Sequence, residues 1–191
     1  MSDRDFWRAA CLAALLAAGS PAALGQQPDL GRPARLELPD VALIDHDGVS
    51  RHLDSDLING RITVISFVFT GCTTICSPVG ANMGALDQLL GDEVGEQVSL
   101  LSVTLDPFND TPARLAAWRS QFDERPGWRL LTGKPEIVDT LLHAMREDAP
   151  DISAHDAFLW LGDPRSGSWT RVSSLASPAS LAALIHGLED R

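Results

Sequence analysis

Two cysteines, Cys72 and Cys76, are separated by three residues in the segment 67–83 (FVFTGCTTICSPVGANM). Thiols at this spacing can form a disulfide, exchange electrons as a redox pair, or supply two ligands to a metal ion. Pro78 fits the first turn of a helix but would remove a hydrogen bond further in, so we expect a helix to begin near Ile75 or Cys76. Backbone N–H groups and the helix dipole favour thiolates there, which predicts pKa values below the free value of about 8.5.

The spacing of the two thiols narrows these choices. A C-x-x-C redox pair has one residue fewer between its cysteines, whereas this spacing at a helix start places the sulfurs roughly one turn apart on the same side. Soft thiolates select copper(I), zinc or iron–sulfur clusters. Two thiolates alone complete neither a structural zinc site nor a cluster. A metal site therefore needs a further ligand from elsewhere in the chain, and a disulfide remains open.

The chain has five histidines that could supply this ligand. His155 stands out because it lies in a loop, 151–156 (DISAHD), that runs directly into the apolar segment 158–161 (FLWL). The other four are expected to be ordinary solvated or helical residues: His46, His52, His143 and His186. His155 is therefore the candidate third ligand.

The elements that position these residues can be predicted from residue patterns. Runs of β-branched and aromatic residues without alternation are typical of strands buried on both faces. Apolar residues at spacings of four, three and four predict a helix after the cysteines, at Val79, Met83, Leu86 and Leu90. Strands are expected at 41–44, 61–70, 98–105, 128–131, 158–161 and 169–172, and further helices at 111–122, 135–145 and 178–188.

This order of elements predicts an α/β domain. Strands alternate with helices, and the last two strands form a hairpin before a final helix, so we expect a mixed central sheet with helices on both faces and the C-terminal β-hairpin at one edge. Functional groups gather at the carboxyl ends of strands, which is where residues 70–76 lie. Asp110 or Thr111 is expected to cap the helix at 111–122.

Residues 1–25 have the features of an export signal. Arg4 and Arg8 precede a short apolar run at 9–18 (AACLAALLAA), and small residues follow at 23–25. The run is too short to span a bilayer. We expect cleavage after this segment, with an uncleaved membrane anchor as the alternative, and a location in the periplasm or on the outer face of the cytoplasmic membrane.

The remainder of the chain is expected to be a polar, flexible lead-in at 26–35 (QQPDLGRPAR) followed by one domain at 36–191. Loss of Cys11 with the signal would leave two cysteines, which is too few for a disulfide scaffold. A bridge that closes so short a loop would also constrain the unfolded chain little. A purely structural disulfide is therefore disfavoured.

The charge balance excludes one class of partner. The chain has 26 acidic and 15 basic residues, for a formal net charge of −11. Such a surface repels nucleic acid and anionic lipid, and no run of basic residues offsets it. We expect no nucleic-acid partner, and a membrane tether only where the N-terminal segment stays uncleaved.

The chain resembles the SCO/SenC family of copper-binding, thioredoxin-like proteins of cytochrome c oxidase assembly. The likeness runs from about Leu36 to the C-terminus. It rests on F-x-F-T-x-C-x-x-x-C at 67–76, on LDP and DTP within 105–112, on GW and LTG within 127–133, and on a single histidine ahead of the last strand pair. The resemblance implies a thioredoxin-like fold.

The resemblance also implies that Cys72, Cys76 and His155 bind a copper ion. A set of two cysteines and one histidine suits copper(I), whereas copper(II) would need a further ligand such as water.

The chain departs from the family pattern at two places near these ligands. Ser77 separates the second cysteine from the proline, and Ala154 stands where an aspartate precedes the histidine in many members. Asp156, and also Asp106, are candidates to orient the imidazole by hydrogen bonding. For Asp106 a turn before the 111–122 helix is the alternative.

Two main functions follow. The first is an exported copper metallochaperone that delivers copper to the CuA site of a cytochrome c oxidase subunit or to a similar apo-protein, with a thiol–disulfide oxidoreductase as the partner that keeps its cysteines reduced. The alternative is an enzyme, a metal-independent thiol–disulfide oxidoreductase in which Cys72 attacks and Cys76 resolves. A copper-responsive or redox sensor stays open, and a peroxidase is disfavoured because no arginine-and-proline setting surrounds Cys72.

Overall fold

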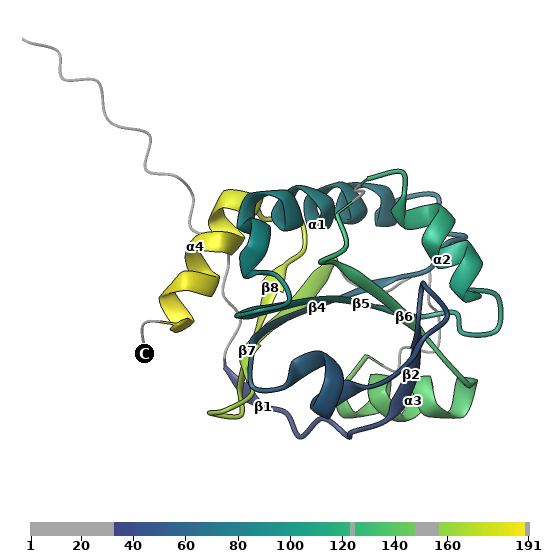
Figure 1. Ribbon diagram of the computed structural model, residues 1–191, viewed down its shortest axis with the longest axis horizontal. Helices are drawn as coiled ribbons and strands as arrows, with labels where there is room; N and C mark the ends of the chain where they lie inside the picture. Colours follow the sequence, from purple (N-terminus) through teal and green to yellow (C-terminus); the bar gives the residue numbers. More distant parts are fainter. Residues whose placement is uncertain (1–32, 123–124, 148–156, 190–191) are drawn as a thin grey trace, which may run out of the picture.

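The computed structural model describes residues 33–122, 125–147 and 157–189, and within them one mixed sheet is covered by helices on both faces (Figure 1). The strands lie in the order β1-β8-β7-β4-β5-β6-β2-β3. Their bounds are β1 Ala34–Arg35, β2 Ala42–Asp45, β3 Ser50–His52, β4 Ile62–Val68, β5 Val98–Thr104, β6 Arg129–Thr132, β7 Phe158–Asp163 and β8 Ser168–Ser173. The neighbours β4, β5 and β6 are parallel, and the other pairs are antiparallel.

The centre of the sheet is the pair β4 and β5, in which every residue is buried. Their register runs from Ile62 opposite Val98 to Val68 opposite Thr104, so the two strands end side by side. The polar atoms buried with them are paired: the hydroxyls of Ser66 and Ser102 are 2.6 Å apart, and Trp128 Nε1 donates to Ser102 Oγ at 2.8 Å. The matched carboxyl ends of these strands form the edge at which the cysteine loop begins.

Helices divide between the two faces of the sheet, as Figure 1 shows. On one face, α1, α2 and α4 bury the core cluster that contains Met83, Trp118 and Ile185. On the other, α3 and a short π-helical segment bury the cluster that contains Leu53 and Leu141. The bounds are α1 Cys76–Leu90, α2 Pro112–Arg119, α3 Pro135–Ala144, α4 Pro178–Glu189, and Leu53–Ile58 for the π-helical segment.

Helix α1 connects two distant parts of this layer. Its predicted stripe of Val79, Met83, Leu86 and Leu90 is buried throughout. Gly80 brings it close to α2, since a Cβ atom there would lie 2.7 Å from the rings of Trp118 and Phe122. At 1.5 Å per residue the fifteen residues of α1 span about 22 Å.

The predicted α/β architecture is confirmed, and each predicted strand and helix is present, with α2 and β4 shorter than expected. One detail is wrong: the hairpin of β7 and β8 is not at the edge, because Ala34 and Arg35 pair with Trp169 and Ser168 of β8. The end of the expected lead-in is thus a short strand that covers the free hydrogen-bonding edge of β8. Among the described residues, no helix is both long and apolar enough to cross a membrane.

Candidate metal and thiol site

The two cysteines lie where β4 passes into α1. Cys76 is the first residue of the helix, after Ile75 as its N-cap, which confirms the predicted helix start. The Cys72 N–H donates to the carbonyl of Phe69 at 3.1 Å, which closes a turn directly after the strand. Cys76 is 1% exposed and packs in the core, whereas Cys72 is only partly buried. One thiol therefore lies at the surface and the other beneath it.

Neither cysteine is in a disulfide, and the Cys72 sulfur contacts the backbone of Cys76. The backbone N–H of Cys76 donates to Cys72 Sγ at 3.3 Å, and Thr74 Oγ1 lies 3.7 Å from the same sulfur. The first N–H group of α1 thus points at Cys72, as expected for an anion-stabilising helix start.

These contacts give the thiols opposite acidities. Burial alone would raise the pKa of Cys72, but hydrogen bonds from the Cys76 thiol, from backbone N–H groups and from the Thr74 hydroxyl outweigh it and lower that pKa to about 7. Burial raises the pKa of Cys76 to about 12, and its hydrogen bond to Cys72 and the charges of Cys72 and Asp110 add to the effect. The predicted lowering is therefore confirmed for Cys72 and wrong for Cys76, because the helix start buries the second sulfur.

Asp110 holds the strand end that leads into this loop. Its side chain is buried and accepts hydrogen bonds from Thr70 N at 3.1 Å, Thr70 Oγ1 at 2.5 Å and Thr104 Oγ1 at 2.7 Å. It therefore ties the end of β4 to the end of β5, directly beside the cysteines. The cap of α2 is Thr111, whose side chain accepts from Arg114 N at 3.3 Å, so Asp110 is not the cap. The signal available in the sequence was an aspartate in the loop that follows a strand's carboxyl end.

Asp106 forms a turn before α2, which was the alternative interpretation of this residue. Its carboxylate accepts from Asn109 Nδ2 at 3.0 and 2.8 Å, and its carbonyl accepts from the N–H groups of Asn109 and Asp110. This turn presents Phe108 to solvent, at 80% exposure.

His155 and its neighbours Ala154 and Asp156 lie outside the described residues. The described chain resumes at Ala157, and β7 runs antiparallel to β4. The rings of Phe158 and Phe67 meet edge to face with their centroids 6.0 Å apart. The chain thus enters β7 beside the end of β4, the strand that leads to Cys72.

The other histidines lie on or next to β2 and β3, on α3 and on α4, not in the cysteine loop. His46 is 9% exposed, and its Nδ1 accepts from Leu130 N at 3.2 Å. The expectation that it is solvated is wrong, because β2 pairs with β6 and carries the ring against Leu130; burial lowers its pKa. His52 is exposed as expected, and so are the helical residues His143 and His186.

The parallel β4–β5 pair, the cysteine at the start of α1 and the antiparallel β7–β8 hairpin define a thioredoxin-like α/β domain. The family model described as SCO1/SenC matches residues 33–188. The chain therefore belongs to the SCO1/SenC family, as its motifs indicated.

Individual relatives agree with this assignment. A Stutzerimonas stutzeri protein named for an inferred role in copper binding is 32% identical over 136 residues, which are 71% of this chain and 65% of that protein. The chain thus spans slightly less than two thirds of that relative. BsSco, a member of the Sco family of cytochrome c oxidase assembly proteins with an identified disulfide switch, has a TM-score of 0.67 at 24% identity, covering 84% of this chain and 95% of BsSco.

Bradyrhizobium japonicum ScoI with copper bound has a similar fold. Its TM-score is 0.62 at 24% identity, and the likeness covers 82% of this chain and 97% of ScoI. Together with BsSco, it confirms the thioredoxin-like fold that the motifs predicted.

Proposed function

We propose that the protein is a copper metallochaperone of cytochrome c oxidase assembly. It binds one copper ion through Cys72, Cys76 and His155 and passes it to the CuA site of an oxidase subunit or to a similar apo-protein. The observation that best supports this is the pair of free thiols at the start of α1, with the Cys76 N–H on Cys72 Sγ. The choice of copper is supported by one relative named for copper binding and another solved with copper bound. The role in oxidase assembly is supported by a third, described as a cytochrome c oxidase assembly protein.

The donor set fits copper(I) as a transported ion. Thiolates are soft ligands, and two of them with an imidazole suit copper(I), whereas zinc would need a fourth ligand. Cys76 has a pKa raised to about 12, so it must lose a proton to bind the metal, and affinity should increase with pH. Cys72 lies at the surface, where an acceptor's thiol can reach the ion and replace it first.

His155 enters the proposal through the sequence motif and the strand register. It precedes Phe158 by three residues, and Phe158 contacts Phe67 at the end of β4. Phe158, the first residue of β7, therefore lies at the same edge of the sheet as the end of β4, where the cysteine loop begins.

Anaerobic titration with copper(I) against a chromophoric chelator tests the proposal. The wild-type protein should bind one equivalent, Cys72→Ser and Cys76→Ser should bind copper(I) far more weakly, and His155→Ala should also bind it more weakly. His52→Ala is the matched control, because His52 is exposed and on β3, away from the cysteine loop. A wild-type stoichiometry near zero would overturn the metal assignment, and an unchanged affinity in His155→Ala would remove the histidine from it.

A thiol–disulfide oxidoreductase is the second candidate, favoured by the unequal acidities of the two cysteines. The Cys72 thiolate would attack a partner's disulfide and release one partner thiolate, forming a mixed disulfide. Cys76 would then attack Cys72 Sγ, release the second partner thiol and leave a Cys72–Cys76 disulfide, so that two electrons pass to the partner.

A disulfide-reduction assay separates the two candidates. The enzyme hypothesis predicts turnover with a regenerating reductant that does not change in His155→Ala, whereas the chaperone hypothesis predicts copper transfer that depends on His155.

We further propose that the domain acts outside the cytoplasm, after export directed by residues 1–25, which lie outside the described residues. In an oxidising compartment the thiols would need a thiol–disulfide oxidoreductase partner to stay reduced. Fractionation and intact mass of the mature protein test this. A mature mass that lacks the first 25 residues in the periplasmic fraction is expected, and a full-length cytoplasmic protein would contradict it.

A further inference from the structure

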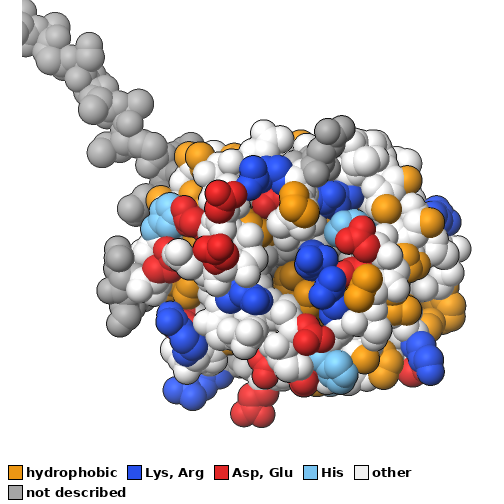
Figure 2. Space-filling view, viewed as in Figure 1, with side chains coloured by type: hydrophobic (Ala, Val, Ile, Leu, Met, Phe, Trp, Pro, Cys, Tyr) orange, Lys and Arg blue, Asp and Glu red, His pale blue; other side chains and the backbone are white. Residues whose placement is uncertain are grey.

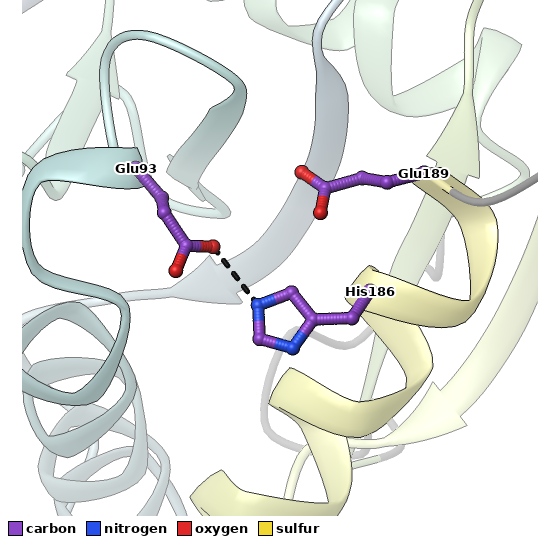
Figure 3. Close-up of side chains that lie close together, drawn as sticks. All are labelled: Glu93, His186 and Glu189. Carbon is purple, nitrogen blue, oxygen red and sulfur yellow. Dashed lines mark hydrogen bonds and ion pairs between the residues drawn. The ribbon is translucent and has the colours of Figure 1, made fainter.

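A second cluster of metal-binding side chains lies near the end of α1 that is remote from the cysteines. Glu93 ends the 3₁₀ turn that follows α1, Gly91–Glu93, and His186 and Glu189 lie on α4. The spacing of three places the two α4 residues on one face of that helix. One donor atom from each of the three residues lies within 4.8 Å of those of the other two (Figure 3).

The three side chains point toward a common space, as Figure 3 shows. His186 Nε2 lies 2.9 Å from Glu93 Oε2. The Glu189 carboxylate faces both, yet its Oε1 is buried from solvent and has no hydrogen-bond partner among the described residues. A buried carboxylate oxygen without a donor is costly. A cation between the three groups would satisfy it.

The surroundings hold the cluster in place. Leu90 of α1 and Ile185 of α4 are buried in one core cluster, so the helix that leads into the Gly91–Glu93 turn is packed with the helix that carries His186 and Glu189. Arg165, which has an electrostatic interaction with Glu189, is already engaged by Asp163 at 2.9 Å. On the side of the molecule where α4 lies, Figure 2 shows acidic side chains beside a histidine.

We propose that Glu93, His186 and Glu189 form a binding site for a divalent first-row transition ion such as Zn²⁺. One imidazole nitrogen and two carboxylate oxygens are the donors that suit zinc, with a position left for water. Copper(I) prefers sulfur, so the site does not compete with the cysteines for it. Because α1 spans about 22 Å, the two sites are independent. The bound ion would crosslink the end of α1 to α4.

Zinc titration of the Cys72→Ser/Cys76→Ser double variant isolates this site from the thiols. One equivalent should bind, and His186→Ala and Glu189→Gln in the same background should weaken binding at least about tenfold, since even indirect partners of a ligand contribute that much. His143→Ala is the matched control, an exposed histidine near the end of α3, and should bind as its parent does. Affinity unchanged in His186→Ala, or no saturable binding, would overturn the proposal.

A measurement on the wild-type chain covers the case in which the double variant does not fold. With the thiols occupied by copper(I), or simply reduced, added zinc should shift the imidazole NMR signals of His186 and leave those of His52 in place. A zinc-induced shift confined to other histidines would refute the site. Neither result depends on the copper proposal, because copper(I) stoichiometry is measured separately at the cysteines.

Discussion

The two ends of α1 present different kinds of metal-binding side chain. At its start, sulfur donors are partly or fully buried, and a buried carboxylate, Asp110, fixes the strand that leads to them. Beyond its other end, oxygen and nitrogen donors meet at the surface, where the Glu93 and His186 side chains are 34% and 49% exposed. One helix thus separates a pair of sulfur donors that the core supports from a cluster of oxygen and nitrogen donors on surface side chains, and copper(I) should favour the sulfur donors.

The largest expected effect is a difference in alkylation rate between the two thiols at the start of α1. Because the pKa of Cys72 is lowered to about 7 and that of Cys76 is raised to about 12, the thiolate of Cys72 dominates at neutral pH. In the reduced, metal-free protein, iodoacetamide should label Cys72 at least about a hundredfold faster than Cys76, even after allowing for its lower intrinsic nucleophilicity. The Cys72 rate should rise with pH and level off above about 7. Mass spectrometry of peptides from a pH series measures both rates, and equal labelling would contradict the contrast.

A crossed pair of variants tests whether the two ends sort their ions. Cys76→Ser should weaken copper(I) binding at least about a hundredfold and leave zinc binding at the Glu93 cluster unchanged. His186→Ala should weaken zinc binding and leave copper(I) binding unchanged. Competition titrations with each ion measure both affinities in both variants. Loss of both ions in either variant would show that the ends are coupled or that the fold has been lost, which circular dichroism distinguishes.

The third prediction concerns the buried support of the cysteine end. Asp110→Ala leaves the Thr70 and Thr104 donors without an acceptor and should lower the free energy of unfolding by about 3 kcal/mol. Asp106→Ala is the control, because among the described residues its carboxylate bonds the exposed Asn109 amide, and should cost less than about 1 kcal/mol. Urea denaturation measures both. Equal costs would mean that Asp110 does not hold the strand ends together.

A smaller effect is expected where α1 packs between its two ends. In Gly80→Ala the new Cβ would press on the rings of Trp118 and Phe122, which should lower the free energy of unfolding by about 1–3 kcal/mol. Gly187→Ala on α4 meets no atom within 4 Å, so helix propensity should raise stability by about 0.5–1 kcal/mol. Thermal unfolding of the two variants compares them, and a stabilised Gly80→Ala would show that α1 and α2 are less tightly packed.

The elements predicted best from the sequence are those that a local residue pattern determines. β4, β5 and the stripe of α1 were found because continuous burial leaves runs of apolar residues at a fixed period. The strand at 34–35, β3 and the segment at 53–58 were not, because such short pieces depend on a free edge or a neighbouring surface.

Long-range contacts explain the residues whose roles the sequence did not predict. Asp110 was interpreted as a cap, although its partner Thr70 lies 40 residues away. His46 was expected to be solvated, and its contact with Leu130 spans 84 residues. The same limit applies to the second cluster, since Glu93 and His186 are 93 residues apart and no motif joins them. The cysteine pair was found because both thiols fall within one short motif.

X-ray absorption spectroscopy of the copper(I)-loaded protein tests the central claim most directly, because it reports the atoms bound to the ion. The account predicts two sulfur ligands and one nitrogen ligand, with the nitrogen lost in His155→Ala and retained in His52→Ala. A copper environment without sulfur, or one that is the same in His155→Ala, would contradict it.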